Sequence, residues 1–457
     1  MNYHFIAIGG AAMHNLAIAL HLKGNKITGS DDEIFEPSKG RLEKYNLLPV
    51  QMGWNSENIH KDIDAVILGM HAREDNPELA KAKDLKIPIY SYPEFIYEQS
   101  KHKTRVVIGG SHGKTTITAM VLHVLEKQGV NADYMVGSKL DGFEVMVKLS
   151  ESAPVIVLEG DEYLSSPIDR RPKFHLYKPH IALISGIAWD HINVFPTFEI
   201  YKEQFSKFID LIEPNGSLAY AAEDPVLKTI VESAKANIDI QSYDLPTYYI
   251  NAQNNKTVLI FQDQEYELMI FGAHNLRNLE GARQLCEKIG IAPKDFYTSI
   301  RSFSGASNRL ETIATGDSCT IFKDFAHSPS KLKATTQAVK NQFAKRKLVA
   351  VMELHTFSSL NAEFLSQYKD AMNDADTAIV YYNPETIKHK RLEPISVEQV
   401  KKAFANENLQ VFTDSQLLVN RILQESWKHK NLLLMSSGNF DGVDYIKLSE
   451  EILATKP

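Results

Sequence analysis

The chain has 457 residues, of which 44% are hydrophobic and 23% are charged, and its formal net charge is -7. These values indicate an ordinary folded protein of about three domains, and the negative charge with dispersed basic residues argues against a nucleic-acid partner. Only two cysteines, Cys286 and Cys319, are present, which excludes a disulfide framework and a cysteine metal cage. The start lacks a basic signal region, and no apolar run approaches the ~20 residues that span a bilayer. We therefore expect a cytoplasmic protein with no membrane contact.

The first hundred residues predict a β-α-β unit. Residues 4–8 form a predicted buried strand, 13–22 a helix and 26–29 a second strand that ends in Ser30 and Asp31. An acid at that point is typical of a dinucleotide fold, but the glycine fingerprint fails because Ala11 and His14 stand where glycines belong. A dehydrogenase is therefore disfavoured, and another nucleotide or a structural turn remains. Further predicted elements are strands at 65–69 and 87–90, a helix that begins near Pro77, and a linker at 101–103.

A glycine-rich turn follows the next strand and carries the strongest chemical signal. Residues 106–108 form an apolar strand, which is followed by Gly110, Gly113, Lys114 and Thr115, and then by a predicted helix at 117–128. Such a loop can turn successive N–H groups towards phosphate, while the lysine supplies a charge and the threonine hydroxyl can bind magnesium. The helix N-terminus favours the same anion. The alternative is a tight turn with a solvated lysine.

Acids stand at the ends of the two following predicted strands. Residues 155–158 lead into Glu159, Asp161 and Glu162, and residues 180–184 lead towards Asp190 and His191. Continuous apolar runs are typical of a parallel sheet buried on both faces, and ligands bind at its carboxyl edge. An acidic strand end alone is more often solvated, but two beside a phosphate loop favour a metal site. We expect both strands to lie next to the strand of the loop.

The pattern changes after residue 243. Alternating residues at 257–261 and 266–271 predict an antiparallel hairpin, and 272–278 open a helix to about residue 290, where Asn275 is either a helix cap or a nucleotide contact. From about residue 305 a third set of strands and helices predicts another parallel, doubly wound domain. Its predicted strands are 319–322, 348–352, 378–382 and 432–435, its predicted helices include 414–427, and its polar strand exits are 324–329 and 436–442.

Together these motifs resemble those of the Mur ligases, and the resemblance covers essentially the whole chain. The residues that carry it are Gly110–Thr116, Glu159–Glu162, Asp190 and His191, His274, Asn275 and Asn278, Asn308–Glu311, and Asp324–His327 with Pro329. The resemblance implies an α/β fold of three domains. These would be a UDP-sugar-binding Rossmann-like domain at 1–102, an ATP-binding P-loop domain at 103–304 with a mainly parallel sheet and a hairpin region, and a Rossmann-like ligase domain at 305–457 that presents the amine.

The resemblance also implies ATP-dependent formation of an amide bond in cell-wall synthesis or recycling. The carboxylate of UDP-N-acetylmuramate would be activated as an acyl phosphate and attacked by the amine of L-alanyl-γ-D-glutamyl-meso-diaminopimelate. The stretch from Asp161 to Pro179 favours this tripeptide over L-alanine. The Phe205 that replaces a carbamylated lysine of other members fits either acceptor. Departures are Ser328 in place of a histidine, Ser185–Gly186, and the absence of an arginine after His355. Alternatives are L-alanine addition, a folylpolyglutamate synthase-like ligase and a non-catalytic nucleotide-binding switch.

The resemblance assigns roles to individual residues. Lys114, Glu159 and His191 would be catalytic, and Thr115, Glu159 and His191 would hold magnesium, for which manganese can substitute. ATP would contact Gly110, Ser111, His112, Gly113, Lys114, Thr115, Thr116, Asn275, Asn278, Arg309, Asp324 and His327. The UDP-sugar would contact Gly9, Gly10, Ala11, Ala12, Met13, Ser30, Asp31, His71 and His112.

Overall fold

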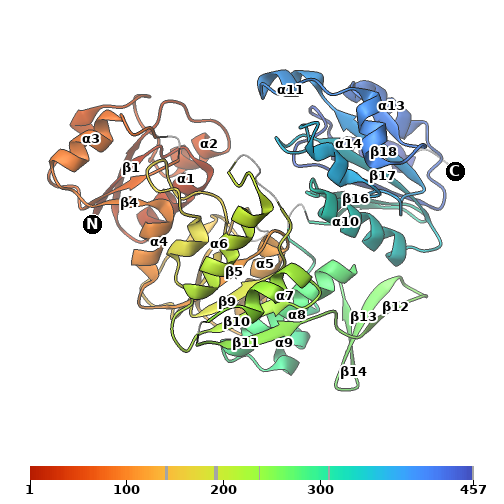
Figure 1. Ribbon diagram of the computed structural model, residues 1–457, viewed down its shortest axis with the longest axis horizontal. Coiled ribbons are helices and arrows are strands. Elements are labelled where there is room, and N and C mark those ends of the chain that lie inside the picture. The colour runs from red at the N-terminus through yellow and green to blue at the C-terminus, as the bar shows by residue number, and fades with distance from the viewer. Residues whose placement is uncertain (71, 139–142, 190–193, 236, 307–308, 455–457) are drawn as a thin grey trace. The chain divides into compact units, whose positions relative to one another are not determined.

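Four β-sheets organise the described part of the chain, with helices packed against them (Figure 1). The computed structural model describes residues 1–454 except 71, 139–142, 190–193, 236 and 307–308. The described residues fall into two units, each with its own packed interior. The first unit contains those up to Asp244 together with Gly281–Ser299, and the second contains Leu245–Glu280 and those from Ile300 onward. The predicted α/β class is confirmed, and the borders of the three domains stay a prediction.

The first sheet is fully parallel, with strand order β2-β1-β3-β4. The predicted N-terminal β-α-β unit is present, because the helix α1 connects β1 to β2. Local signals start the later helices: Asn76 caps α3 before Pro77, and Ser91 forms a capping box with Glu94 in α4. The elements are β1(Asn2–Ile6), α1(Ala11–Leu22), β2(Lys26–Ser30), α2(Ser38–Lys44), η1(Ser56–Asn58), β3(Ala65–Leu68), α3(Pro77–Asp84), β4(Ile89–Ser91) and α4(Tyr92–Ser100).

The second sheet has seven strands in the order β11-β10-β9-β5-β8-β6-β7. All neighbours are parallel except β6 and β7. Its middle strands β5, β8 and β9 are almost fully buried, as expected for apolar runs in a sheet that is covered on both faces. The strands are β5(Thr104–Gly109), β6(Ala132–Met135), β7(Val147–Lys148), β8(Val155–Glu159), β9(Ile181–Ile184), β10(Ser217–Ala221) and β11(Asp239–Tyr243).

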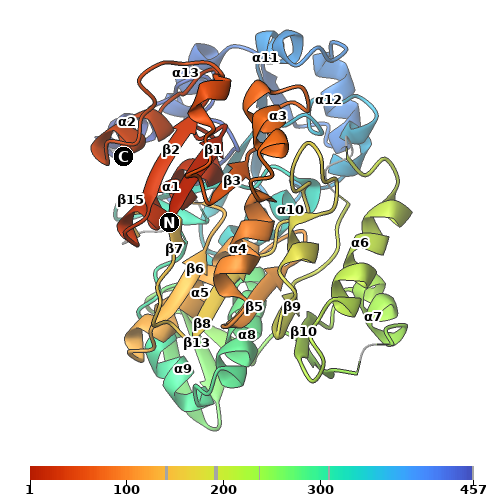
Figure 2. The ribbon, with the colours of Figure 1, turned by 90° about the vertical axis from the view of Figure 1, so that its left-hand side faces the viewer.

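Helices cover this sheet, and one of them follows the glycine-rich loop directly. Helix α5 packs against β5 and β8, and Figure 2 shows it alongside these strands. Helix α6 has one buried face that carries Tyr201, Phe205 and Phe208, which are spaced three to four residues apart. The remaining elements are α5(Lys114–Lys127), η2(Lys173–Leu176), α6(Phe198–Asp210), α7(Pro225–Glu232), α8(Ala273–Lys288) and α9(Pro293–Ile300).

The hairpin predicted after residue 243 is present and belongs to a third, antiparallel sheet of three strands, in the second unit. Strands β13 and β14 pair with Ile260 opposite Glu265, around a two-residue turn at Gln262 and Asp263, both of which have positive φ. Such a turn matches the right-handed twist of the strands. The strands are β12(Tyr248–Asn251), β13(Lys256–Phe261) and β14(Gln264–Leu268), and β12 was not predicted.

The fourth sheet has six strands in the order β15-β16-β20-β17-β18-β19. The predicted parallel sheet is correct for five of them, but β15 pairs antiparallel to β16 through a short turn. Strand β17 is buried on both faces, because Ala350 and Met352 enter one hydrophobic core and Val349 and Val351 the other. The elements are β15(Glu311–Thr315), β16(Thr320–Asp324), α10(Pro329–Gln342), β17(Lys347–Leu354), η3(Phe364–Tyr368), β18(Thr377–Tyr382), α11(Pro384–His389), α12(Val397–Phe404), β19(Gln410–Phe412), α13(Ser415–Leu423), β20(Lys430–Met435) and α14(Tyr445–Ala454).

None of the described helices is both long enough and apolar enough to cross a bilayer.

Candidate functional site

The glycine-rich loop lies between β5 and α5, as predicted from the sequence. Gly110 has φ 122° and Gly113 has φ 78°, a region that favours glycine. A Cβ at Gly110 would also lie 2.8 Å from the Ser185 nitrogen, so the position has no room for a side chain. The helix begins at Lys114, and its first-turn residues Thr115 and Thr116 are buried. The loop therefore places the start of a 14-residue helix at the carboxyl edge of the sheet.

Lys114 is held over this loop by two oxygen acceptors. Its Nζ donates to the Gly110 carbonyl and to Glu162 Oε2, each at 2.6 Å. Burial disfavours the charged lysine, but the carboxylates of Glu162 and Asp161 outweigh it and raise the pKa of Lys114. The ammonium therefore stays protonated at the loop.

Strand β8 brings Glu159 to the same place, since β5 pairs directly with β8 and with β9. The expectation that both predicted strands flank the strand of the loop is confirmed. The Thr115 hydroxyl donates to Glu159 Oε1 at 2.8 Å, and the Gly137 N–H donates to Glu159 Oε2 at 2.8 Å. The carboxylate is buried, with 8% of the residue exposed.

A hydroxyl and a carboxylate in contact are ligand types that suit Mg²⁺, so Thr115 and Glu159 fit the predicted metal. Within the part of the chain that the structure describes, no group of three or more His, Cys, Asp or Glu residues forms a metal cluster. The third predicted ligand, His191, and its neighbour Asp190 lie outside the described residues. The metal assignment stays a prediction.

The segment after β8 adds further charge next to the loop. Lys173 Nζ contacts Asp161 Oδ2 at 2.6 Å. Burial disfavours the Asp161 carboxylate, but Lys173 and Lys114 outweigh this effect and lower its pKa. The exit of β9 is tied to the loop by the backbone, because Ser111 N–H donates to the Gly186 carbonyl at 3.0 Å. His112 lies in the loop, with Nδ1 2.7 Å from the Ser111 carbonyl.

The predicted UDP-sugar residues come together in the first sheet. Gly9 to Met13 form the turn after β1 and the start of α1, and the Gly9 N–H donates to Asp31 Oδ2 at 2.7 Å. Burial raises the pKa of Asp31 to about 6, although the Gly9 N–H opposes this change. Ser30 lies beside Asp31 and donates its hydroxyl to Glu78. His71, also predicted, lies outside the described residues.

Glu78 is a buried residue that the sequence did not single out. It is 0% exposed and accepts hydrogen bonds from the Asn55 N–H at 3.0 Å and the Asn58 amide at 2.9 Å, besides that of Ser30. His4 Nε2 lies 3.3 Å from its Oε2. Partners so far apart in the chain leave no local signal, so only the fold could reveal this anchor.

In the second unit, three predicted residues cluster at the exit of β16. Asp324 accepts from the Leu310 N–H at 2.5 Å and the Ala326 N–H at 2.7 Å. Arg309 stacks 4.6 Å from the centre of the Phe325 ring, and His327 Nδ1 donates to the Phe325 carbonyl at 2.8 Å. Burial raises the pKa of Asp324, and the Arg309 charge and the two N–H groups only partly offset it.

Asn275 and Asn278 are brought to the first turns of α8. The Asn275 amide donates to the Phe271 carbonyl at 3.0 Å, which ties the chain before the helix to its start. Asn275 is the third residue of α8 and its amide donates, whereas a helix cap accepts from backbone N–H groups, so this bond does not support the cap. The nucleotide contact stays a prediction.

A second carboxylate of this unit, Glu353 at the end of β17, was not predicted as a site residue. It is 2% exposed and accepts from the Phe440 N–H at 2.9 Å and from the Ser436 hydroxyl. His355 Nδ1 lies 3.5 Å from its Oε1. Burial opposes ionisation, but hydrogen bonds from His355, Ser436 and the Phe440 N–H outweigh it and lower the pKa of Glu353. The signal in the sequence was a polar residue at the end of an apolar strand.

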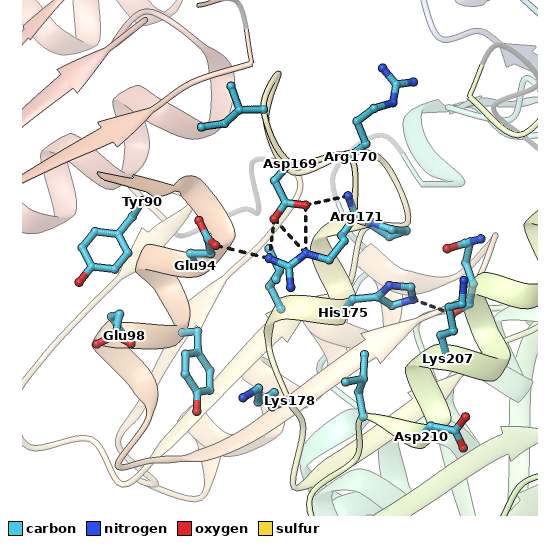
Figure 3. Close-up of a pocket in the computed structure, with 16 residues that line it drawn as sticks. Tyr90, Glu94, Glu98, Asp169, Arg170, Arg171, His175, Lys178, Lys207 and Asp210 are labelled. Atoms are coloured by element: carbon cyan, nitrogen blue, oxygen red, sulfur yellow. Dashed lines mark hydrogen bonds and ion pairs between the residues drawn. The ribbon is translucent and has the colours of Figure 1, made fainter. Parts of the chain in front are cut away.

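The first unit also contains a cavity of about 970 Å³ between α4, the segment 168–178 and α6 (Figure 3). Arg171 lines this cavity, and its Nη2 lies 2.6 Å from Asp169 Oδ2 and 3.5 Å from Glu94 Oε1. None of its lining residues belongs to the predicted phosphate, metal or sugar sites, so the cavity is separate from them.

The fold and the site define an α/β protein with an acid and a hydroxyl in contact beside a glycine-rich loop, at the carboxyl edge of its seven-stranded sheet. Residues 2–104 match the catalytic domain of the Mur ligase family, 108–286 the Mur ligase middle domain, and 308–438 the Mur ligase glutamate ligase domain.

Individual proteins resemble the chain over nearly its full length. A UDP-N-acetylmuramate–L-alanine ligase of Clostridium kluyveri is 30% identical over 92% of this chain and 93% of its own. The corresponding protein of Clostridium botulinum is 32% identical over 82% of each. Among solved structures, a murein peptide ligase of Psychrobacter arcticus superposes with TM-score 0.65 and 22% identity over 100% of both chains. A UDP-N-acetylmuramate–alanine ligase of Thermotoga maritima gives TM-score 0.70 and 20% identity over 99% and 98%.

The chain therefore belongs to the Mur ligase family. It is an ATP-dependent ligase that joins an acid to an amino group in peptidoglycan synthesis.

Proposed function

We propose that the chain joins the lactyl carboxylate of UDP-N-acetylmuramate to the amine of the tripeptide L-alanyl-γ-D-glutamyl-meso-diaminopimelate. The observation that carries this proposal is the meeting of Lys114, Thr115 and Glu159 at one sheet edge, where a triphosphate and a carboxylate can be neutralised together. The tripeptide is supported by the insertion after Glu162, which folds back with Lys173 on Asp161. The structural likeness to a murein peptide ligase concerns the fold.

The chemistry requires activation because a carboxylate has no good leaving group for an amine. ATP supplies it by converting the carboxylate to an acyl phosphate, from which the amine displaces phosphate. Lys114 contributes fixed positive charge where negative charge develops, and the loop and helix N-terminus orient the phosphates. Removal of such a charge costs several kcal/mol of barrier, or roughly 10²-fold in rate.

We assign one magnesium ion to Thr115 and Glu159 and a second to Glu159 and His191, where manganese is expected to substitute because histidine is an unusual ligand for magnesium. Such ions would neutralise phosphate and carboxylate charge. The hydrogen bond from the Thr115 hydroxyl to the Glu159 carboxylate orients the two oxygen ligands relative to each other.

The remaining assignments concern recognition of the two nucleotides. We assign Asn275, Asn278, Arg309, Asp324 and His327 to ATP. The turn from Gly9 to Met13, with Ser30, Asp31, His71 and His112, is assigned to the UDP-sugar. The Gly9 N–H that holds Asp31 supports a turn that is ordered for this purpose.

L-Alanine addition is the second candidate, because relatives at 30% and 32% identity over most of the chain are L-alanine ligases. One experiment separates the candidates: ADP release with UDP-N-acetylmuramate against L-alanine, the tripeptide, other free amino acids and a folate with glutamate. Turnover only with the tripeptide supports the proposal, and turnover with L-alanine replaces it by the second candidate. Turnover with folate and glutamate, or ATP binding without ADP release for any acceptor, overturns both.

A further inference from the structure

A buried chain of hydrogen bonds links helix α6 to the phosphate loop. The Ala188 N–H donates to Ser111 Oγ at 2.9 Å, and Ser111 Oγ lies 2.8 Å from the Tyr201 hydroxyl. The Tyr201 hydroxyl donates to Glu162 Oε1 at 3.1 Å, and Glu162 Oε2 accepts from Lys114 at 2.6 Å. The chain thus runs from the exit of β9 through α6 to the lysine of the loop.

The direction of these bonds follows from the number of protons available. Tyr201 has one hydroxyl proton, which it gives to Glu162, so it accepts the proton of Ser111. The Ser111 oxygen in turn accepts the Ala188 N–H. Within this chain of bonds each hydroxyl therefore both donates and accepts, and hydrogen bonds aligned in this way strengthen one another.

All three side chains in the middle of the chain are shielded from water. Tyr201 is 0% exposed, Glu162 1% and Ser111 3%. In such surroundings a hydroxyl bound to a carboxylate contributes more than at the surface, and a group that loses its partner pays the full cost of desolvation.

The ring of Tyr201 is fixed independently of its hydroxyl. It packs with ring centres 5.3 Å from Phe195 and 5.2 Å from Phe205. Thr197 caps the N-terminus of α6, because its side chain accepts a hydrogen bond from the Ile200 N–H. A phenylalanine at position 201 would keep this packing and remove only the hydroxyl.

We propose that Tyr201 is a positioning residue for ATP binding. Its hydroxyl couples Ser111 to Glu162 and so fixes the positions of the loop and of Lys114. Tyr201 does not touch the reacting atoms and acts through Glu162 and Ser111. The proposal rests on the proposed phosphate-binding role of the loop.

The chain offers a matched control for the removal of a buried tyrosine hydroxyl. Tyr177 is also 0% exposed, and its hydroxyl has no hydrogen-bond partner among the described residues. Tyr177→Phe therefore removes the same atom from the same unit without breaking a bond.

The test compares wild type, Tyr201→Phe and Tyr177→Phe by calorimetric titration with the magnesium complex of AMP-PNP and with UDP-N-acetylmuramate. Loss of a hydrogen bond to a charged group predicts affinity for AMP-PNP about tenfold weaker in Tyr201→Phe, with unchanged affinity for UDP-N-acetylmuramate. Tyr177→Phe should leave both unchanged. Equal weakening for both ligands, or unchanged AMP-PNP binding, would overturn the positioning role.

A double-mutant cycle with Ser111→Ala tests whether Ser111, Tyr201 and Glu162 act as one relay, that is, as a coupled chain of hydrogen bonds. If the hydroxyls act as one chain, Ser111→Ala should weaken AMP-PNP binding less in the Tyr201→Phe background than in wild type. Additive effects would overturn the relay. Lys114→Ala tests the phosphate-binding role of the loop separately. If Lys114→Ala keeps its affinity for AMP-PNP, the proposed phosphate-binding role is wrong. If Lys114→Ala loses affinity for AMP-PNP while Tyr201→Phe keeps it, only the proposed role of Tyr201 is wrong.

Discussion

The carboxylates at the strand ends of the two large sheets are used differently. In the seven-stranded sheet, Glu159 and Glu162 hold the Thr115 hydroxyl and the Lys114 ammonium, the groups that a phosphate or metal would meet, and Glu159 also accepts the Gly137 N–H. In the six-stranded sheet, Asp324 and Glu353 accept backbone N–H groups of neighbouring loops, and Glu353 also accepts the Ser436 hydroxyl. We therefore expect ligand chemistry at the acids of the seven-stranded sheet and loop order at those of the six-stranded sheet.

This difference matters because Asp324 was predicted to contact ATP. Both oxygens of Asp324 accept backbone N–H groups, so its main role is to order the loop. Arg309 and His327 are the neighbouring side chains of this ordered loop that remain candidates for ATP contact. The comparison predicts that substitutions of the acids in the seven-stranded sheet change the chemistry, whereas those in the six-stranded sheet change local stability.

Lys114→Ala should have the largest effect, because it removes the fixed charge at the loop. We expect ADP release to fall by roughly 10²-fold or more, with binding of UDP-N-acetylmuramate largely unchanged. Steady-state ADP release and a direct binding titration measure the two quantities. Lys127→Ala, at the exposed end of the same helix, is the control. Unchanged turnover in Lys114→Ala would remove the loop from the mechanism.

Asp324→Asn tests the second half of the comparison. The amide replaces one acceptor by a donor opposite an N–H group, so the loop should lose about 1–3 kcal/mol of stability. Hydrogen exchange at the Leu310 and Ala326 amides should rise, while ATP affinity changes little. A loss of ATP affinity without faster exchange would show that Asp324 is a direct ligand contact and would break the comparison.

The sequence predicted the loop well because every part of it is local. The strand, Gly110, Gly113 and Lys114 stand in one short stretch, and the apolar runs of β8 and β9 indicated buried parallel neighbours. Glycine geometry and continuous burial are properties of single segments, so they can be recognised without the fold.

Long-range polar contacts could not be predicted in this way. Glu78 is anchored by residues from three other segments, and Tyr201 reaches Ser111 across 90 positions. The antiparallel strand β15 was also missed; none of its residues is buried. The pairing of each acid with its hydrogen-bond donor depends on how distant segments pack together. This packing leaves no pattern in a short stretch of sequence.

Glu159→Gln tests the predicted metal site of the seven-stranded sheet. A neutral amide binds Mg²⁺ more weakly than a carboxylate, so the magnesium concentration for half-maximal ADP release should rise about tenfold. The measurement is a magnesium titration of turnover at saturating ATP. Glu126→Gln, on the exposed side of α5, should leave the titration unchanged. The same magnesium dependence in both variants would contradict the assignment of Glu159.

The smallest effect concerns pH, where the two carboxylates of the six-stranded sheet should behave oppositely. The folded pKa of Asp324 is raised above 3.8, so its ionisation lowers the unfolding free energy as pH rises through that raised pKa. The folded pKa of Glu353 is lowered below 4.5, so its contribution is present above pH 4.5 and is lost as pH falls through the folded value. Relative to wild type, Asp324→Asn should therefore gain stability with rising pH, and Glu353→Gln should lose stability with rising pH. Denaturant unfolding at several values between about pH 3 and 7 measures both differences, and slopes of the same sign would show that the two carboxylates do not differ in this way.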